Sequence, residues 1–199
     1  MKKQGIIVIV IMSLVLFAGC TNHRNDTGAN DKTIVIVSHD YPYYENESAI
    51  YEKASIVIRG TVIDKRAEYM SHVGELTEEQ KKDPKLNPGG EVDKEKEFTT
   101  IYKIQVTDSF KGKVLKDDIV EIKQFGGETD DTIYIDEGAP QIEQKREYIM
   151  FLETYENSPA TLLNDVQSLY SIDKDKLISH TDNAFNMTIE KLEALSKGQ

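Results

Sequence analysis

Two stretches in the middle of the chain alternate between apolar and polar residues, and this pattern restricts the fold more than any other feature. Residues 98–107 (FTTIYKIQVT) alternate from Tyr102 onward, and residues 118–125 (DIVEIKQF) repeat the pattern before a Gly-Gly pair. Alternation with a period of two is typical of a strand with one buried face and one face in water. The sequence therefore predicts a sheet at the centre of the fold.

Further runs of β-branched and aromatic residues extend this sheet. The clearest is 55–63, whose central Gly60 indicates a bulge or sharp bend of the kind that closed barrels need. The run at 147–152 is almost wholly apolar, which is typical of a central strand. The other predicted strands lie at residues 33–37, 132–135, 161–163, 169–172 and 177–178, and a hairpin connection joins the last two.

Short helices are predicted at both margins of the strands. Asn46 or Ser48 is a suitable N-cap for a helix through Lys53, and residues 188–196 place three aliphatic side chains on one helical face. The predicted fold is mainly β: a small closed or partly open β-barrel, with one short helix before the first barrel strand and another at the C-terminus. A flat two-sheet sandwich is the alternative.

The first twenty residues are organised like an export signal. Lys2 and Lys3 precede about 14 apolar or small residues, from Ile6 to Gly19, fewer than the roughly 17–25 that a membrane-spanning helix needs. Cys20, the only cysteine, stands at the boundary with a polar segment. An uncleaved signal anchor and an ordinary secreted protein cut nearby are the alternatives to a lipid attachment at this cysteine.

Residues 16–20 (LFAGC) resemble the lipobox of bacterial lipoproteins. The resemblance implies that the Cys20 sulfur receives a diacylglycerol, with fatty acids such as palmitate, and that the signal peptide, residues 1–19, is removed in front of it. Stable anchoring takes about two acyl chains, because each buried methylene contributes about 0.8 kcal/mol. The protein is therefore expected on the extracytoplasmic face of the cell membrane, attached through acylated Cys20.

The rest of the chain is interpreted as one tethered domain. Residues 20–33 are polar and form a lipidated tether, and residues 34–199 form a single β-barrel domain. A charged insertion at 69–97 separates two predicted strands, and loops of this length are either functional or disordered. The aromatic stretch 39–44 (HDYPYY) either packs on the domain or is exposed for binding.

Charge and cysteine usage exclude several classes of function. Loss of residues 1–19 removes two lysines and shifts the formal net charge from −11 to −13. An acidic domain argues against nucleic acid and against electrostatic docking on anionic lipid, because both require clustered Lys and Arg. Once Cys20 is acylated, no thiol remains for a disulfide, a thiolate metal site or a Cys nucleophile.

The predicted strands also carry a family resemblance. The segments concerned are 54–62 (ASIVIRGTV), 102–106 (YKIQV) and 109–112 (SFKG). Together they resemble the netrin-like module, the OB-like fold of the tissue inhibitors of metalloproteinases. The order of Lys111-Gly112, Gly126-Gly127 and Phe151-Leu152 is similar to that in a group of lipoproteins of uncharacterised function from low-GC Gram-positive bacteria.

This resemblance covers about residues 50–155 and implies an OB-like barrel. It does not carry over the inhibitors' activity. Those inhibitors present a disulfide-bonded N-terminal cysteine to the protease zinc, whereas Cys20 is expected to be acylated and set apart by a tether.

No catalytic spacing is found in the sequence. The four histidines are scattered without zinc-site spacing, and neither a Gly-x-Ser-x-Gly elbow nor a phosphate-binding glycine loop is present. No cofactor and no metal site are predicted. The calcium candidates are Glu128, Asp130 and Asp131, which crowd one glycine-started loop, although acidic turns are usual in a chain of this charge.

The sequence thus favours a non-enzymatic binding or regulatory module of the cell envelope. An envelope protein is the expected partner, contacting residues 69–97, and nucleic acid is not expected to bind. One alternative is a hydrolase acting on wall or surface polymers, with carboxylates assembled from distant positions. The other is a structural or stress-response lipoprotein without a specific ligand.

Overall fold

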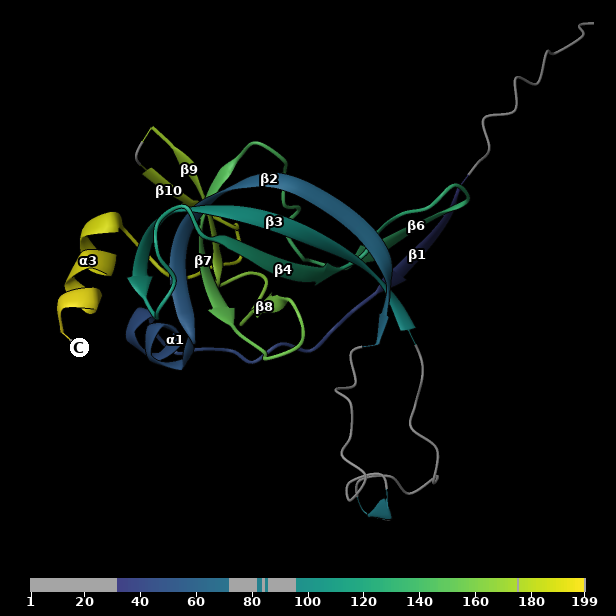
Figure 1. The fold of residues 1–199 in the computed structure, drawn as a ribbon, viewed down its shortest axis with the longest axis horizontal. Helices are drawn as coiled ribbons and strands as arrows, with labels where there is room; N and C mark the ends of the chain where they lie inside the picture. The colour runs from purple at the N-terminus through teal and green to yellow at the C-terminus, as the bar shows by residue number, and fades with distance from the viewer. Residues whose placement is uncertain (1–31, 72–81, 84, 86–95, 175, 199) are drawn as a thin grey trace, which may run out of the picture. The chain divides into compact units, whose positions relative to one another are not determined.

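The computed structural model describes residues 32–71, 82–83, 85, 96–174 and 176–198. Cys20, the predicted signal peptide and nearly all of the predicted tether lie outside the described residues, as does most of the predicted insertion. The described residues form two sheets and two helices, α1 (Glu47–Lys53) and α3 (Ile189–Lys197) (Figure 1). The prediction of a mainly β fold with a short helix at each margin is confirmed.

The larger sheet has seven strands in the order β10-β9-β7-β2-β3-β4-β8. Its strands are β2 (Ile56–Ser71), β3 (Lys96–Lys111), β4 (Ile119–Phe125), β7 (Glu147–Glu153), β8 (Ala160–Leu162), β9 (Leu169–Asp173) and β10 (Lys176–Ser179). Because β8 pairs with both β4 and β7, five of these strands (β2, β3, β4, β8 and β7) close into a partial ring.

The smaller sheet has the order β1-β6-β5. Its strands are β1 (Thr33–Val37), β5 (Gly127–Glu128) and β6 (Thr132–Asp136), and β1 runs parallel to β6. Residues 38–46, which we call the strap, connect β1 to α1 and pass below β8 in the view of Figure 1. The strap contains the whole aromatic stretch, residues 39–44, singled out in the sequence.

The central pair of strands is longer than predicted. β2 and β3 each span 16 residues, and their pairing continues to Ser71 and Lys96, so strand structure enters the predicted insertion at both ends. Beyond residue 63 the β2 side chains are mostly exposed, which removes the alternation that reveals a strand in sequence. Backbone pairing and ring contacts stabilise this extension instead. The ring centroids of Tyr69 and Phe98, for example, lie 5.0 Å apart.

Gly60 lies at a shift in the pairing register between β2 and β3, as the sequence predicted for a bulge. A Cβ atom at this position would lie 2.5 Å from Ile104 Cγ2 and 2.8 Å from the Gln105 carbonyl oxygen. The close approach of β3 therefore requires glycine here.

The core has two layers, one on each face of the larger sheet. Met150 and Leu152 of β7 face the interior of the ring, whereas Ile149 and Phe151 face the layer covered by both helices. All four side chains are fully buried, which confirms the prediction of a central strand at 147–152. Leu192 of α3 completes the outer layer and is also fully buried.

Candidate functional site

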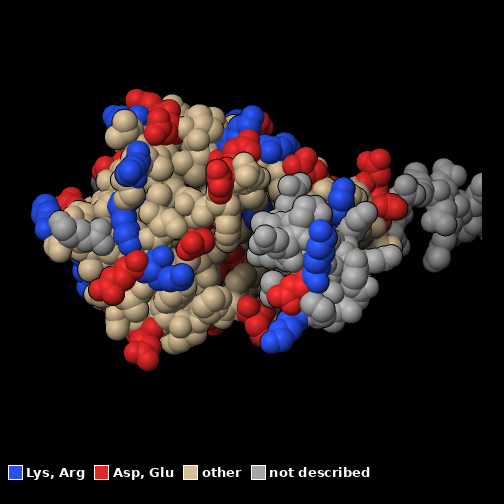
Figure 2. Space-filling view, turned by 60° about the horizontal axis from the view of Figure 1, so that its bottom comes forward, with Lys and Arg blue, Asp and Glu red and all other residues tan. Residues whose placement is uncertain are grey.

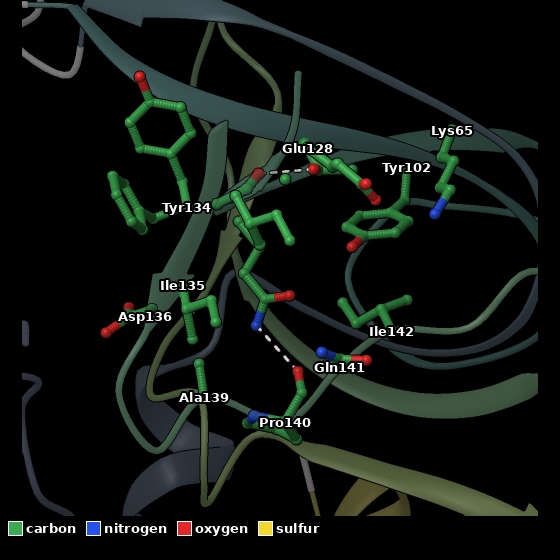
Figure 3. A pocket seen from close by; sticks show the side chains of 16 residues that line it. Lys65, Tyr102, Glu128, Tyr134, Ile135, Asp136, Ala139, Pro140, Gln141 and Ile142 are labelled. Atoms are coloured by element: carbon green, nitrogen blue, oxygen red, sulfur yellow. Dashed lines mark hydrogen bonds between the residues drawn. The ribbon is translucent and has the colours of Figure 1, made fainter. Parts of the chain in front are cut away.

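A groove opens where the small sheet diverges from the ends of β3 and β4 (Figure 3). Gly126 and Gly127 produce the divergence, because their φ angles of 102° and 143° turn the chain sharply out of β4 into β5. A Cβ at Gly127 would lie 2.7 Å from Thr100 Oγ1. The Gly-Gly pair that ends the predicted strand thus shapes the groove.

The groove has a cavity volume of about 280 Å³ and a mixed lining. Its aliphatic walls include Ile133, Ile135 and Ile142. Its polar lining includes Lys65, Thr100, Tyr102, Gln124, Glu128 and Gln141. Figure 3 shows the Tyr102 hydroxyl directed into the space between β6 and Ile142, whereas the Lys65 ammonium lies at the rim, on the other side of the Tyr102 ring from Tyr134. Such a lining of apolar walls with a few polar groups is typical of a ligand site.

The polar groups of the groove differ in the hydrogen bonds and ion pairs that they already form. Burial raises the pKa of the Tyr102 hydroxyl to about 12, so this hydroxyl remains protonated and available as a donor. Gln124 Nε2 donates to the Pro140 carbonyl oxygen at 3.2 Å, which fixes one wall. Lys65 forms no ion pair with any described residue, although the domain is strongly acidic.

A second hollow of about 430 Å³ continues the groove and shares Lys65 and Glu128 with it. Its other cations are already neutralised. Lys32 binds Glu128 at 2.7 Å, and Arg66 binds both carboxylate oxygens of Glu121, at 2.7 and 2.9 Å. Lys65 is therefore the cation that a negatively charged ligand would meet in this region.

A cluster of titratable side chains built around two buried carboxylates lies behind β6, and its Asp136 carboxylate points away from the groove (Figure 3). Asp136, the last residue of β6, contributes to the groove wall, but its carboxylate points away from the cavity in Figure 3. The Asp136 side chain is 1 % exposed. Its Oδ2 atom accepts a hydrogen bond from the Tyr41 hydroxyl at 2.5 Å and lies 3.0 Å from His39 Nδ1. Tyr41 and His39 both belong to the strap.

The second carboxylate of this cluster comes from the turn at residues 164–167. Asn164 Oδ1 accepts hydrogen bonds from the backbone amides of Val166 and Gln167, each at 2.9 Å, and this turn carries Asp165 inward. Asp165 is 4 % exposed. Burial raises the pKa of its carboxyl to about 6; the nearby Tyr41 hydroxyl lowers that pKa, and the charge of Asp136 raises it.

The predicted site residues are only partly within the described part of the chain. Cys20 lies outside it. Of the calcium candidates, Glu128 pairs with Lys32, and Asp131 accepts hydrogen bonds from the hydroxyls of Thr129 and Thr132, which lowers the pKa of both carboxyls. Among the residues that the structure describes, no three His, Cys, Asp or Glu side chains are grouped as metal ligands. Calcium binding in this loop stays a prediction.

This cluster around Asp136 and Asp165 was not predicted. Its members come from the strap, the end of β6 and a turn after β8, and no spacing in the sequence links them. The only available signals were the polar residues within the aromatic stretch 39–44 and an aspartate at the end of a β-branched run. The pair Asp136 and Asp165 is nevertheless an assembly of carboxylates from distant positions, as the hydrolase alternative requires.

The comparisons with known proteins leave the family open. The chain matches no protein-family model and no curated protein.

Neither of the two described helices is long and apolar enough to cross a membrane. On the face shown in Figure 2, Lys and Arg side chains are interspersed with Asp and Glu and form no continuous basic area.

Proposed function

We propose that this protein is a lipid-anchored, extracytoplasmic module that binds another component of the cell envelope in the groove between β6 and β4. The observation that carries the proposal is the groove itself, where Lys65, which forms no ion pair with any described residue, lies beside amide, hydroxyl and aliphatic groups. This lining suits a peptide, or another amide-containing chain, that bears a negative charge. The binding is non-enzymatic.

The finer points of the fold belong to the same proposal. The partial ring of β2, β3, β4, β8 and β7, with the bulge at Gly60, is consistent with an OB-like barrel of the netrin-like kind. The lipobox-like residues 16–20 support attachment through Cys20. The anchor would keep the groove close to the membrane and to the proteins and polymers there.

A hydrolase acting on wall or surface polymers is the second candidate, and the Asp136–Asp165 pair is the observation that favours it. A substrate would need access to both carboxylates. Asp136 and Asp165 are instead almost fully buried, and the Asp136 carboxylate lies on the opposite side of β6 from the groove (Figure 3). Binding in the groove is therefore the better-supported function.

Site-specific cross-linking in cells tests the groove. A photo-reactive amino acid at Gln141 is expected to capture one defined envelope component, whereas the same amino acid at the exposed Glu193 of α3 captures none. A third probe at Gln80 tests whether the predicted insertion contacts the same partner. The Gln141 product should disappear in the variant Lys65→Glu and persist in Lys53→Glu, an equal charge change on exposed α1. Equal capture in both variants would contradict binding in the groove.

The anchor has its own test. Cys20→Ala is expected to abolish fatty-acid labelling and to release the protein from the membrane fraction, since no other thiol is present to be acylated. Labelling that persists in Cys20→Ala would exclude the lipid attachment, and the groove could then still be judged by the cross-linking result alone.

A further inference from the structure

The cluster behind β6 contains more hydrogen-bond acceptors than donors. Asp136 Oδ2 is contacted by Tyr41 and His39. Asp136 Oδ1 and Asp165 Oδ2 are both buried and have no hydrogen-bond partner among the described residues. A buried carboxylate oxygen without a donor is strongly destabilising, and two of them in one cluster call for an additional positive charge or donor.

The surrounding side chains do not supply that charge. His39 and Tyr41 face the cluster from the strap. From β3, Tyr102 is close enough to feel the charge of Asp165. The Glu97 carboxylate, also on β3, lies 3.9 Å from His39 Nε2. β4 contributes the uncharged Gln124, whose side chain lowers the pKa of the Asp165 carboxyl.

Among the described residues, no lysine or arginine forms an ion pair with Asp136 or Asp165. His39 is the basic side chain that the described residues bring to the cluster, and Glu97 is a further carboxylate near its ring.

Two carboxylates that share a buried site cannot both ionise at low cost, and the proton they retain belongs to the pair rather than to one residue. We propose that Asp136, Asp165 and Tyr41 form a proton-binding site, and that the bound proton holds the strap against the turn at residues 164–167. A protonated carboxyl supplies the missing donor and removes the repulsion between β6 and that turn. The raised pKa of Asp165, about 6, agrees with this arrangement.

The side chains of β6 and of the turn at residues 164–167 form hydrogen bonds that hold the strap in place. Besides the bonds of His39 and Tyr41 to Asp136, the Pro42 carbonyl oxygen accepts a hydrogen bond from Asn164 Nδ2 at 2.8 Å. The backbone N–H and carbonyl of Tyr44 both pair with the Gln167 side-chain amide, each at 3.0 Å. A movement of the 164–167 turn away from Asp136 would therefore strain three attachments of the strap at once.

The direction of the pH effect follows from the raised pKa. A carboxyl whose folded-state pKa is about 6, against an ordinary value of 3.8, binds its proton more tightly in the folded protein than in the unfolded chain. Stability from this site is therefore complete below about pH 4, falls as the pH rises to about 6, and stays low above that value. Acid tightens the strap, and ionisation loosens it.

Thermal melting between pH 4 and pH 8.5 tests the proton site. Asp165→Asn keeps the shape and removes the charge, so its melting temperature is expected to exceed that of the unaltered protein by several degrees at pH 8 and to equal it at pH 4. Asp40→Asn, the same change at an exposed strap residue, should follow the unaltered protein throughout. Parallel curves for Asp165→Asn and the unaltered protein would overturn the proposal. Asp136→Asn serves as the second variant if Asp165→Asn does not fold.

Amide exchange and added cations complete the test. In the unaltered protein, residues 38–45 should lose protection at pH 8 relative to Asp165→Asn, while the amides of β7 are alike in both proteins. Unchanged strap protection would remove the link between the proton and the strap. A rise in melting temperature with millimolar Ca²⁺ or Mg²⁺ at pH 8, absent in Asp165→Asn, would show that a metal ion fills the site and would likewise overturn the proposal.

Discussion

The five-stranded ring buries its apolar side chains, whereas the small β1-β6-β5 sheet exposes two isoleucines and buries an aspartate. In β7 of the ring, every side chain from Tyr148 to Leu152 is buried, and both faces are covered by apolar layers. In the small sheet, Ile34 and Ile36 are each 60 % exposed, while Asp136 is almost fully buried. The ring therefore supplies the stability of the domain, and the small sheet departs from the pattern where we place the groove and the proton site.

The difference has a simple physical origin. The ring is enclosed by two helices on one side and by its own curvature on the other, so apolar side chains leave water on both faces. The small sheet has no described layer over its Ile34 and Ile36 face, and it fills its other side with rings and polar groups from the strap. Exposed apolar residues beside a groove are common at binding surfaces.

The largest effect is expected in the ring. Phe151→Ala should lower the free energy of unfolding by about 3–5 kcal/mol, because it leaves a cavity in a layer that packs against α1, α3 and Tyr170. Urea denaturation measures the change, and Leu115→Ala, at a 69 % exposed position, is the control. A loss below about 1 kcal/mol for Phe151→Ala would mean that the outer layer is loosely packed, and the contrast between the two regions would fail.

An intermediate effect is expected at the cluster behind the small sheet. Tyr41→Phe removes the hydrogen bond to Asp136 Oδ2 and should cost about 1–2 kcal/mol at pH 7, since a buried carboxylate loses a donor. Tyr43→Phe, at a 71 % exposed position on the same strap, should be neutral. Chemical denaturation of the two variants side by side decides the matter, and equal stabilities would indicate that the strap does not depend on Asp136.

The smallest effect is expected on the exposed face of the small sheet. Ile36→Thr keeps a β-branched residue and should change stability by less than about 0.5 kcal/mol, because little apolar area is lost from a side chain that is 60 % exposed. Ile104→Thr, the same substitution at a fully buried ring position, should destabilise strongly. A large loss in Ile36→Thr would show that part of the chain outside the described residues covers this face.

Much of the ring, and the helix α1 that packs on it, could be predicted from sequence, because their signals are local. The alternation in 102–107, the apolar run at 147–152, Gly60 and the cap at Asn46 each reflect the backbone geometry or burial of one short segment. The extension of β2 and β3 was missed because exposed strands have no apolar period. The groove was missed because the Gly-Gly pair indicates a turn without indicating which strands separate there.

The sequence by itself determined the strand series, the margin helices, the acidic surface and the expectation of a lipid anchor at Cys20, since each depends on composition or on neighbouring residues. Only the tertiary structure brought His39 and Tyr41 to Asp136, across 97 and 95 residues. The parallel register that sets Val37 beside Asp136 carries the strap to that carboxylate. Such a juxtaposition depends on pairing between distant segments, and a local pattern contains no information about it.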